Sequence, residues 1–185
     1  VRGTKLAYEF PSGIKVHVVN GMSWEKQGIT LEMKLRQIEK AVNLFPGGNL
    51  AENIYIYDCA DPDNFLSEIY YKIPGFKGGA SVSPNGDIEI FDSGIIDEGI
   101  LHHEMAHNLD KRLADVLEDR FSSSIEWETA AKADHIWGYP SEYAKTYPSE
   151  DFAESIRYFL DDKKLFAKKF PNRYKIIEKI LKVDI

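Results

Sequence analysis

Two histidines and a glutamate form the most informative group of residues in the sequence. They stand in the string His102-His103-Glu104-Met105-Ala106-His107. On an α-helix, the four-residue spacing of His103 and His107 puts both imidazoles on one face, where both can reach one metal ion. Neutral imidazole suits Zn²⁺, and Glu104 lies beside that face, where it can take a proton from a zinc-bound water. The string therefore predicts one zinc ion, with His103 and His107 as ligands and Glu104 as the base; His102 points elsewhere on the helix.

A catalytic zinc site needs a third protein ligand and an open position for water. The chain lacks the third histidine of the extended form of this motif, because Leu113 stands where it would be. The best candidates are Glu150 and Glu154, one helical turn apart among apolar residues. Carboxylates on an inward-facing helix surface are costly unless they are paired, so we expect one to bind the metal and the other to hold a ligand histidine. A solvated acidic first turn, favoured by the helix dipole, is the alternative.

Apolar spacing indicates which elements position these residues. It predicts strands at 14–19 and 53–57, a hairpin of 80–83 with 88–91 around an Asn-Gly turn, and an aromatic segment, helical or irregular, at 65–73. Helices are predicted at 30–45, at 97–118, after a capping box of Ser123 and Glu126, after an N-cap at Ser149, and from Pro171. The expected fold is α+β: a small mixed or antiparallel sheet, an active-site helix and C-terminal helices. We expect one zinc metallopeptidase domain over residues 1–185, with a strand-and-helix subregion at about 1–92 and a helical zinc-binding subregion at about 93–185.

Composition excludes several classes of function. The net charge of −7 argues against nucleic acid as a partner, and the lysines near 163–179 alternate with apolar residues as on a solvated helix face. No apolar run is long enough for a transmembrane helix. Cys59 is the only cysteine, so no internal disulfide forms, and it is better interpreted as a buried thiol than as a nucleophile. The chain begins at Val1 rather than Met, which leaves a removed export signal open.

The segment Tyr143-Ala144-Lys145-Thr146-Tyr147-Pro148-Ser149-Glu150-Asp151-Phe152-Ala153-Glu154-Ser155, together with the histidine motif, resembles a known family. It is similar to the catalytic domain of anthrax lethal factor and closer to the secreted Pro-Pro endopeptidases of clostridia and related bacteria. The resemblance implies a minimal zincin-like metallopeptidase fold, a secreted location, Glu150 as third zinc ligand, Glu154 in the outer shell and Tyr143 assisting catalysis. Spacing alone would make Tyr143 one of three nearby tyrosines, most of which pack with the hydroxyl in water.

A second, weaker resemblance covers Pro74-Gly75-Phe76-Lys77-Gly78-Gly79-Ala80-Ser81-Val82. It is similar to the segment leading into the edge strand on which these peptidases lay their substrate. The resemblance implies that Gly78, Gly79, Ala80, Ser81 and Val82 bind an extended peptide as an added strand. Tyr70 stands where the Pro-Pro endopeptidases carry a tryptophan, so an aromatic wall is kept in altered form.

The predicted function is a zinc endopeptidase that cleaves an extended segment, proline-rich if it follows the family. Glu104 would act as general base and Tyr143 would stabilise the oxyanion. Glu154 would orient a ligand histidine, with Asp110 a weaker candidate for such work. The alternatives are a noncatalytic toxin-like binding domain, the catalytic domain of a larger toxin and a nonpeptide zinc hydrolase. We expect a peptide or protein substrate and favour a monomer.

Overall fold

The computed structural model describes residues 4–19, 28–45, 51–58, 78–92, 98–114 and 118–182. The chain divides into two compact units, Val1–Val42 with Ala51–Leu101 and Asn43–Leu50 with His102–Ile185, called unit 1 and unit 2 below. Each unit is described by itself. The expectation of a single domain, with subregions at about 1–92 and 93–185, stays a prediction.

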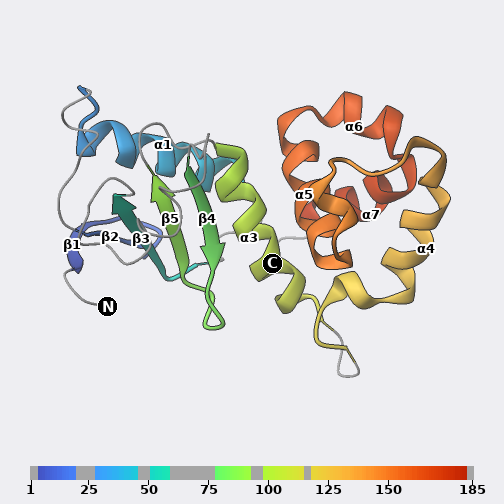
Figure 1. Cartoon of the computed structure of the whole chain (residues 1–185), viewed down its shortest axis with the longest axis horizontal. Coiled ribbons are helices and arrows are strands. Elements are labelled where there is room, and N and C mark those ends of the chain that lie inside the picture. Colours follow the sequence, from blue (N-terminus) through green and yellow to red (C-terminus); the bar gives the residue numbers. More distant parts are fainter. Residues whose placement is uncertain are drawn as a thin grey trace. The chain divides into compact units, whose positions relative to one another are not determined.

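Unit 1 contains a five-stranded mixed sheet (Figure 1). Its strands are β1 (Thr4–Glu9), β2 (Lys15–Val19), β3 (Asn53–Asp58), β4 (Gly78–Val82) and β5 (Ile88–Asp92). Their order is β1-β2-β3-β5-β4, with β2, β3 and β5 parallel and the outer strands β1 and β4 antiparallel to their neighbours. The expected small mixed sheet is therefore confirmed.

Alternation along the strands gives the sheet one apolar face. Val16 pairs with Ile54, and Ile54 pairs with Ile88, so buried β-branched residues form a row across three strands. The next row places His17 against Tyr55, whose rings stack with centroids 4.7 Å apart on the opposite face. Helix α1 (Leu31–Leu44) runs along the sheet in Figure 1 and buries Ile38 and Ala41.

Tight turns connect the antiparallel pairs. Between β4 and β5 the Ser83 N–H donates to the Asp87 carbonyl at 2.8 Å, and Gly86 has a φ of 89°, which is easy only for glycine. The predicted Asn-Gly hairpin is therefore confirmed. Between β1 and β2 the Phe10 N–H donates to Ile14 at 2.9 Å. The pattern at 4–9 did not predict β1.

The helices of unit 2 follow α3 (Glu98–Arg112), which starts in unit 1. They are η2 (Phe121–Ser123), α4 (Ile125–Ala133), η3 (His135–Trp137), η4 (Tyr143–Lys145), α5 (Pro148–Asp161), α6 (Lys163–Lys169) and α7 (Pro171–Lys182). The ring of Trp127 lies 5.0 Å from that of Phe152, which is 5.8 Å from Phe121. These edge-to-face contacts build the core beneath α5, as aromatic pairs prefer.

A buried network of charged side chains connects α7 to the same core. Asp134 accepts hydrogen bonds from the backbone N–H groups of Asn172 at 3.1 Å and Arg173 at 2.9 Å, so it caps the start of α7. The Arg173 side chain, fully buried, donates through Nε to Asp151 on α5 at 3.1 Å. This network fixes the N-terminal turn of α5, because Asp151 lies in that turn.

Several predicted helix boundaries were wrong. Helix α3 ends at Arg112 rather than near residue 118, and the apolar residues at 116 and 117 that suggested a longer helix lie outside the described residues. The N-cap of α4 is Ser124, which accepts from the Trp127 N–H at 3.2 Å, instead of Ser123. Helix α5 begins at Pro148, which suits the first helical position. Ser149 therefore lies inside the first turn and is not the cap.

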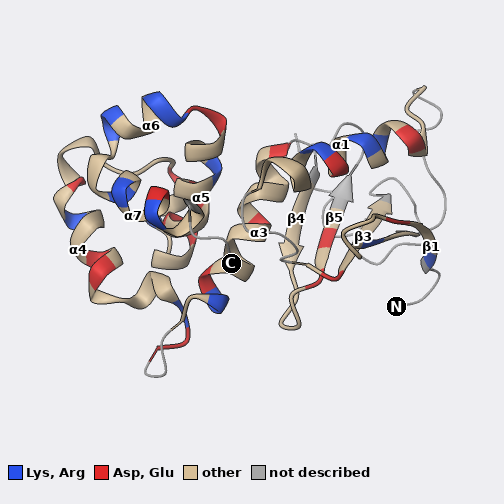
Figure 2. Ribbon diagram, turned by 180° about the vertical axis from the view of Figure 1, so that it is seen from behind, with Lys and Arg blue, Asp and Glu red and all other residues tan. Residues whose placement is uncertain are grey.

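The lysines of the C-terminal helices lie on the surface, as predicted. On α6, Lys163, Lys164, Lys168 and Lys169 are exposed while Phe166 is buried. The ribbon of Figure 2 shows acidic and basic residues interspersed along the helices of unit 2. None of the helices in the described part of the chain is long and apolar enough to cross a membrane.

Candidate metal centre

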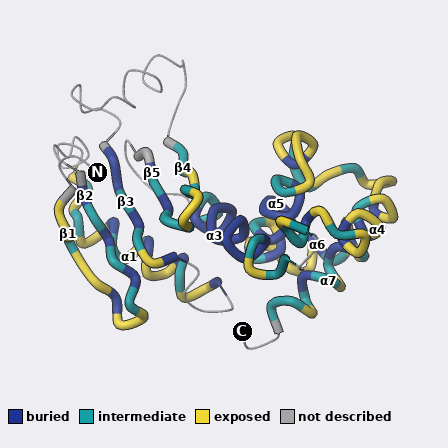
Figure 3. The backbone as a smooth tube through the Cα atoms, turned by 90° about the horizontal axis from the view of Figure 1, so that it is seen from below, coloured by how far each residue is buried: buried dark blue, intermediate teal, exposed yellow. Residues whose placement is uncertain are grey.

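Helix α3 is buried along residues 101–110, as the dark colour along it in Figure 3 shows. Six of these ten residues are polar: His102, His103, Glu104, His107, Asn108 and Asp110. Burying so many polar groups in one helix is costly unless each has a partner. The partners of these residues therefore indicate what the helix is for.

Three side chains from α3 and α5 converge on one point in unit 2. The Nε2 atoms of His103 and His107 lie 3.1 Å apart. The Glu150 Oε2 atom lies 3.0 Å from the first and 3.2 Å from the second. The imidazole planes are at 83° to each other, so the two rings approach from different directions. These three residues form the one group of metal-ligand type found among the described residues.

The geometry of this group fits a metal ion. Three electron-pair donors at nearly equal spacing repel one another unless a cation or shared protons lie between them. In a tetrahedral site with bonds of about 2.0 Å, ligand atoms are about 3.3 Å apart, close to the three observed separations. Glu150 Oε2 is buried without a well-formed hydrogen bond, although two imidazole nitrogens adjoin it. The lone pairs thus meet in a common space, and His103, His107 and Glu150 could hold a metal ion.

Glu154 contacts the far side of the His103 ring. Its Oε1 atom lies 2.7 Å from His103 Nδ1, and both side chains are buried. A carboxylate here accepts a hydrogen bond from Nδ1–H. The lone pair of Nε2 is then available to bind a metal ion. Arg157 Nη1 donates to the same Oε1 at 3.3 Å, which helps to keep Glu154 ionised.

The charges of the group are strongly coupled. Burial raises the pKa of Glu150, but the contacts with the two imidazoles outweigh it and lower that pKa to about 2. Burial lowers the pKa of His103, but the contacts with the Glu150 and Glu154 carboxylates outweigh it and raise that pKa to about 9. In the metal-free protein His103 therefore carries a proton that a metal ion must displace.

Glu104 lies on α3 between the two histidines and is buried. Burial raises its pKa, while the adjacent His103 and His107 act in the opposite direction. A carboxylate with a raised pKa beside a metal position has the properties of a general base that accepts and returns a proton.

Tyr143 lies on η4, with its ring centroid 5.7 Å from that of His103. The side chain is 55% exposed, so little packing fixes it. Partial burial and the carboxylates of Glu150, Glu104 and Glu154 raise its pKa, which keeps the phenol protonated and able to donate a hydrogen bond. The structure thus brings Tyr143 to the same group of residues as the sequence prediction.

The remaining predicted residues fall into three situations. Asp110 accepts from the Ser122 N–H at 2.6 Å and from its hydroxyl at 2.7 Å, so its observed bonds fix η2 rather than a ligand histidine. His102, which we left out of the ligand set, lies 6.0 Å from the Phe45 ring. Gly78 to Val82 form β4, which ends the sheet order, and Tyr70 lies outside the described residues. The substrate-binding role of β4 stays a prediction.

Sequence reasoning missed two residues that adjoin Glu154. Arg157 follows it by three positions on α5, a spacing at which helical side chains meet, so the pair could have been predicted. The second is Ser141. Burial raises the pKa of Glu154, but the side chains of His103 and Ser141 outweigh it and lower that pKa to about 2. Ser141 lies in an irregular stretch between η3 and η4, and no periodic pattern marks it.

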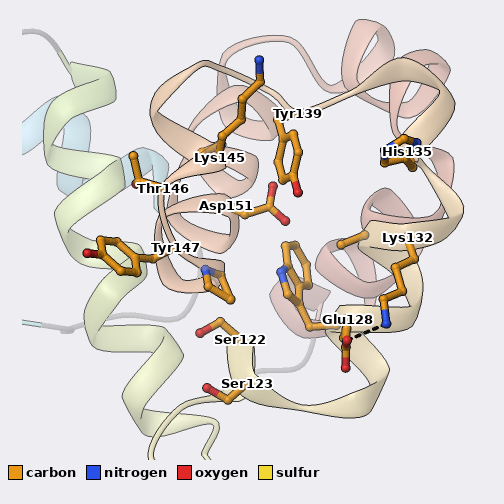
Figure 4. A pocket seen from close by; sticks show the side chains of 14 residues that line it. Ser122, Ser123, Glu128, Lys132, His135, Tyr139, Lys145, Thr146, Tyr147 and Asp151 are labelled. Atoms are coloured by element: carbon orange, nitrogen blue, oxygen red, sulfur yellow. Dashed lines mark hydrogen bonds and ion pairs between the residues drawn. The ribbon is translucent and has the colours of Figure 1, made fainter.

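Unit 2 also contains a cavity of about 510 Å³, shown in Figure 4. Ala144, Thr146 and Tyr147 form part of its lining, next in sequence to Tyr143 on one side and Glu150 on the other. Trp127 and Asp151 also line it, and an ion pair of Lys132 with Glu128 at 2.6 Å lies on its α4 side. The segment from η4 to the start of α5 thus contributes residues both to the lining of the cavity and to the candidate metal centre.

No protein-family model matches the chain, and no curated protein matches it in sequence. Among solved structures, the chain is similar to the Pro-Pro endopeptidase (PPEP-2) of Paenibacillus alvei, with a TM-score of 0.53 and 16% sequence identity. The match covers 89% of this chain and 96% of that one. At this identity the likeness shows the fold alone. The α+β fold is thus similar to that of a solved Pro-Pro endopeptidase, in agreement with the motif resemblance, and the match does not bear on lethal factor in particular.

Proposed function

We propose that the protein is a zinc-dependent endopeptidase. The observation that carries this proposal is the convergence of His103 Nε2, His107 Nε2 and Glu150 Oε2 at 3.0 to 3.2 Å from one another. Two imidazoles and one carboxylate are a ligand set of catalytic zinc, which leaves a fourth position open. The fold, shared with a solved Pro-Pro endopeptidase, gives the proposal independent support.

When bound, zinc would activate water and polarise the scissile carbonyl. The protein's own residues would do the remaining work. Glu104 accepts the proton of the attacking water and delivers it to the leaving amine, a role that its raised pKa suits. Tyr143 donates its phenolic hydrogen to the oxyanion as the tetrahedral intermediate forms. Glu154 keeps the His103 ring in one orientation and one tautomer.

The substrate in this proposal is a peptide segment that binds in extended form. Among the strands in the described part of the chain, β4 ends the sheet order, so its outer edge would offer backbone groups to an added strand. Gly78 and Gly79 would let that segment approach the backbone closely. The neighbour of similar fold cleaves at Pro-Pro bonds, as its name states. We extend that preference to this chain as the first substrate class to test, together with a secreted location.

A substitution at Glu104 tests the proposal. Glu104→Gln should lower kcat on a cleaved peptide by at least about 100-fold, because it removes the base and keeps the shape. Zinc content, measured by atomic absorption, should stay at one ion per chain. The matched control is Glu128→Gln, which removes an exposed glutamate of α4 and should leave kcat unchanged.

Cleavage of a mixed peptide library, read by mass spectrometry, defines the specificity. Enrichment of proline on both sides of the cut would support the Pro-Pro preference. A wild-type protein that binds zinc but cleaves nothing would contradict the peptidase proposal and favour a noncatalytic binding domain. Full activity of the Glu104→Gln variant would refute the assigned base.

A further inference from the structure

Unit 2 contains another cavity, of about 430 Å³, at the end of α5 away from the candidate metal centre. Asp161, which lines this cavity, and Glu150 both lie on α5. At a rise of about 1.5 Å per residue they are roughly 16 Å apart along the helix axis. The buried rings of Phe166 and Phe170 also line the cavity. It is therefore a separate feature from the metal centre.

Three exposed aromatic side chains line the same cavity. Trp137 is 62% exposed, and Tyr139 and Tyr158 are also exposed. Exposed apolar side chains that are scattered singly over a surface carry no information, whereas a cluster of them around a cavity is typical of a binding site. These three rings are called the aromatic wall below.

Guanidinium groups already lie against two rings of the aromatic wall. The Arg173 Cζ atom is 5.6 Å from the Tyr139 ring centroid, and the Arg157 Cζ atom is 5.6 Å from that of Tyr158. Tryptophan attracts cations more strongly than tyrosine does. In the described part of the chain, however, no cation lies over the Trp137 ring. The ring best suited to a cation is thus open to one from another molecule.

The charged side chains at the cavity also favour a cation. Asp161 and Asp162 line it, and Lys169 is the basic residue of its lining. Asp162 caps α6 by accepting the Leu165 N–H at 2.9 Å, whereas Asp161 is exposed and has no hydrogen bond or ion pair to another described residue. The net charge of −7 adds a general attraction for cations.

An arginine side chain suits both the aromatic wall and the aspartate. Its guanidinium is planar and weakly hydrated, stacks on aromatic rings and pairs with carboxylates, whereas the ammonium of lysine is strongly hydrated. An apolar occupant would remove water from the Asp161 carboxylate without replacing it. Anionic membrane lipids attract basic segments, so the two aspartates disfavour them as the occupant. The lining therefore selects arginine from a peptide.

We propose that this cavity binds an arginine side chain in a peptide segment of a partner protein, with the guanidinium stacked on Trp137 and paired with Asp161. The site goes beyond the proposed peptidase function and does not rest on it, because no residue of the metal centre takes part. A partner is thus recognised by an arginine that lies outside any segment bound at the metal centre.

The first test titrates the ¹⁵N-labelled, metal-free full chain with the peptide acetyl-Gly-Ser-Arg-Ser-Gly-amide. Two matched peptides carry citrulline, which keeps the shape of arginine without its charge, or lysine. Binding is followed at the indole N–H of Trp137, one of three tryptophans, which its loss in Trp137→Phe assigns. The backbone N–H of Leu165, which also lines the cavity, is the second reporter. Contacts of this kind at an exposed site bind in the millimolar range, so each peptide is added to about 20 mM.

We expect the arginine peptide to shift both signals. It should bind at least about fivefold more tightly than the citrulline peptide, which loses the cation–π contact and the ion pair. The lysine peptide should bind about threefold more weakly than the arginine peptide. Equal binding of the arginine and citrulline peptides would overturn the proposal, as would the absence of any shift at the highest concentration. Equal binding of the lysine peptide would overturn the choice of arginine.

The second test changes the protein. Trp137→Ala and Asp161→Asn should each weaken binding of the arginine peptide, followed at Leu165, by about three- to fivefold. Both residues are exposed, so neither substitution removes core contacts.

Two matched controls accompany these variants. Ile136→Ala changes the exposed neighbour of Trp137, which does not line the cavity, and Asp119→Asn changes an exposed aspartate that precedes η2. Both controls should keep wild-type affinity. Wild-type affinity in Trp137→Ala and Asp161→Asn would overturn the proposal, and an equal loss in the controls would do so too. Because zinc and turnover play no part, failure of the peptidase proposal leaves this result unaffected.

Discussion

The contact between Glu154 and His103 allows a quantitative prediction about metal affinity. Glu154→Gln keeps the size of the side chain and an acceptor oxygen near His103 Nδ1, but it removes the negative charge. Both residues are buried, so solvent does not screen the contact, and the distance of 2.7 Å is that of a charge-assisted hydrogen bond. The substitution should therefore change the strength of the bond with little change in geometry.

The magnitude follows from the difference between two kinds of hydrogen bond. Bonds to a charged group contribute about 1.5–3 kcal/mol and neutral ones about 1 kcal/mol, a difference of about 0.5–2 kcal/mol. That difference corresponds to a loss of roughly 2- to 30-fold in zinc affinity. Loss of an outer partner of a metal-ligating histidine lowers affinity by about 10- to 100-fold in other metal sites, so we expect a 10- to 30-fold weakening.

The assay is competition for zinc with a chromogenic chelator at fixed pH, with Glu128→Gln as the matched control because that glutamate is exposed on α4. The control should keep wild-type affinity. A Glu154→Gln affinity within twofold of the wild type would refute the reasoning, since it would mean that the carboxylate does not strengthen His103 as a ligand. Circular dichroism at the assay temperature establishes that both variants are folded.

Two further predictions concern stability. Because the two carboxylates outweigh burial and raise the pKa of His103 to about 9, from 6.5, the protonated ring stabilises the metal-free fold fully below pH 6.5. This stabilisation, roughly 3 kcal/mol, should be lost as pH rises through 9, and urea unfolding in chelator at pH 6 to 10 measures it; a flat profile would contradict it. Asp110→Ala leaves Ser122 without its acceptor and should lower the free energy of unfolding by about 1–3 kcal/mol. Its zinc affinity should change less than threefold, and a larger loss would restore Asp110 to the outer shell of the metal centre.

The sheet could be predicted where one face of a strand is buried. Strands β2 and β3 alternate between buried aliphatic and half-buried residues, so the period-two pattern is visible. Strand β1 was missed because Leu6 and Tyr8, its large apolar residues, are 50% and 45% exposed. An edge strand that buries little carries no such pattern, and its pairing with β2 comes from backbone hydrogen bonds, which do not depend on side-chain type.

The helix boundaries show a different limit of prediction from sequence. The capping pattern was recognised near α4 but assigned one residue early, because three consecutive serines, at 122–124, offer caps of the same chemistry. At α5 the predicted serine cap was wrong, because Pro148 already supplies a residue suited to the first position. Local propensity thus identifies the element, while the surrounding packing selects the terminal residue.

The candidate metal centre could likewise be predicted only in part, because some of its residues are close in sequence and others are brought together by packing. His103, Glu104 and His107 lie within one helical turn, so the helix geometry alone predicts that the two imidazoles share a face. The residues alone could not say which of Glu150 and Glu154 faces the metal, because both lie on the buried side of α5. That choice depends on how α5 packs against α3, for which the sequence offered only a family resemblance.

The packing explains why two carboxylates one turn apart have different tasks. Both face the same imidazole, that of His103, but from opposite edges: Glu150 Oε2 lies 3.0 Å from Nε2 and Glu154 Oε1 lies 2.7 Å from Nδ1. Residues four positions apart on a helix are about 6 Å apart along its axis, a separation that lets one helix bracket a single ring. Without the His103 ring between them, each carboxylate would lose a partner at a largely buried position, which is costly. The two acids of α5 therefore fix one histidine from both sides: Glu150, the proposed third ligand, adjoins Nε2, and Glu154 adjoins Nδ1.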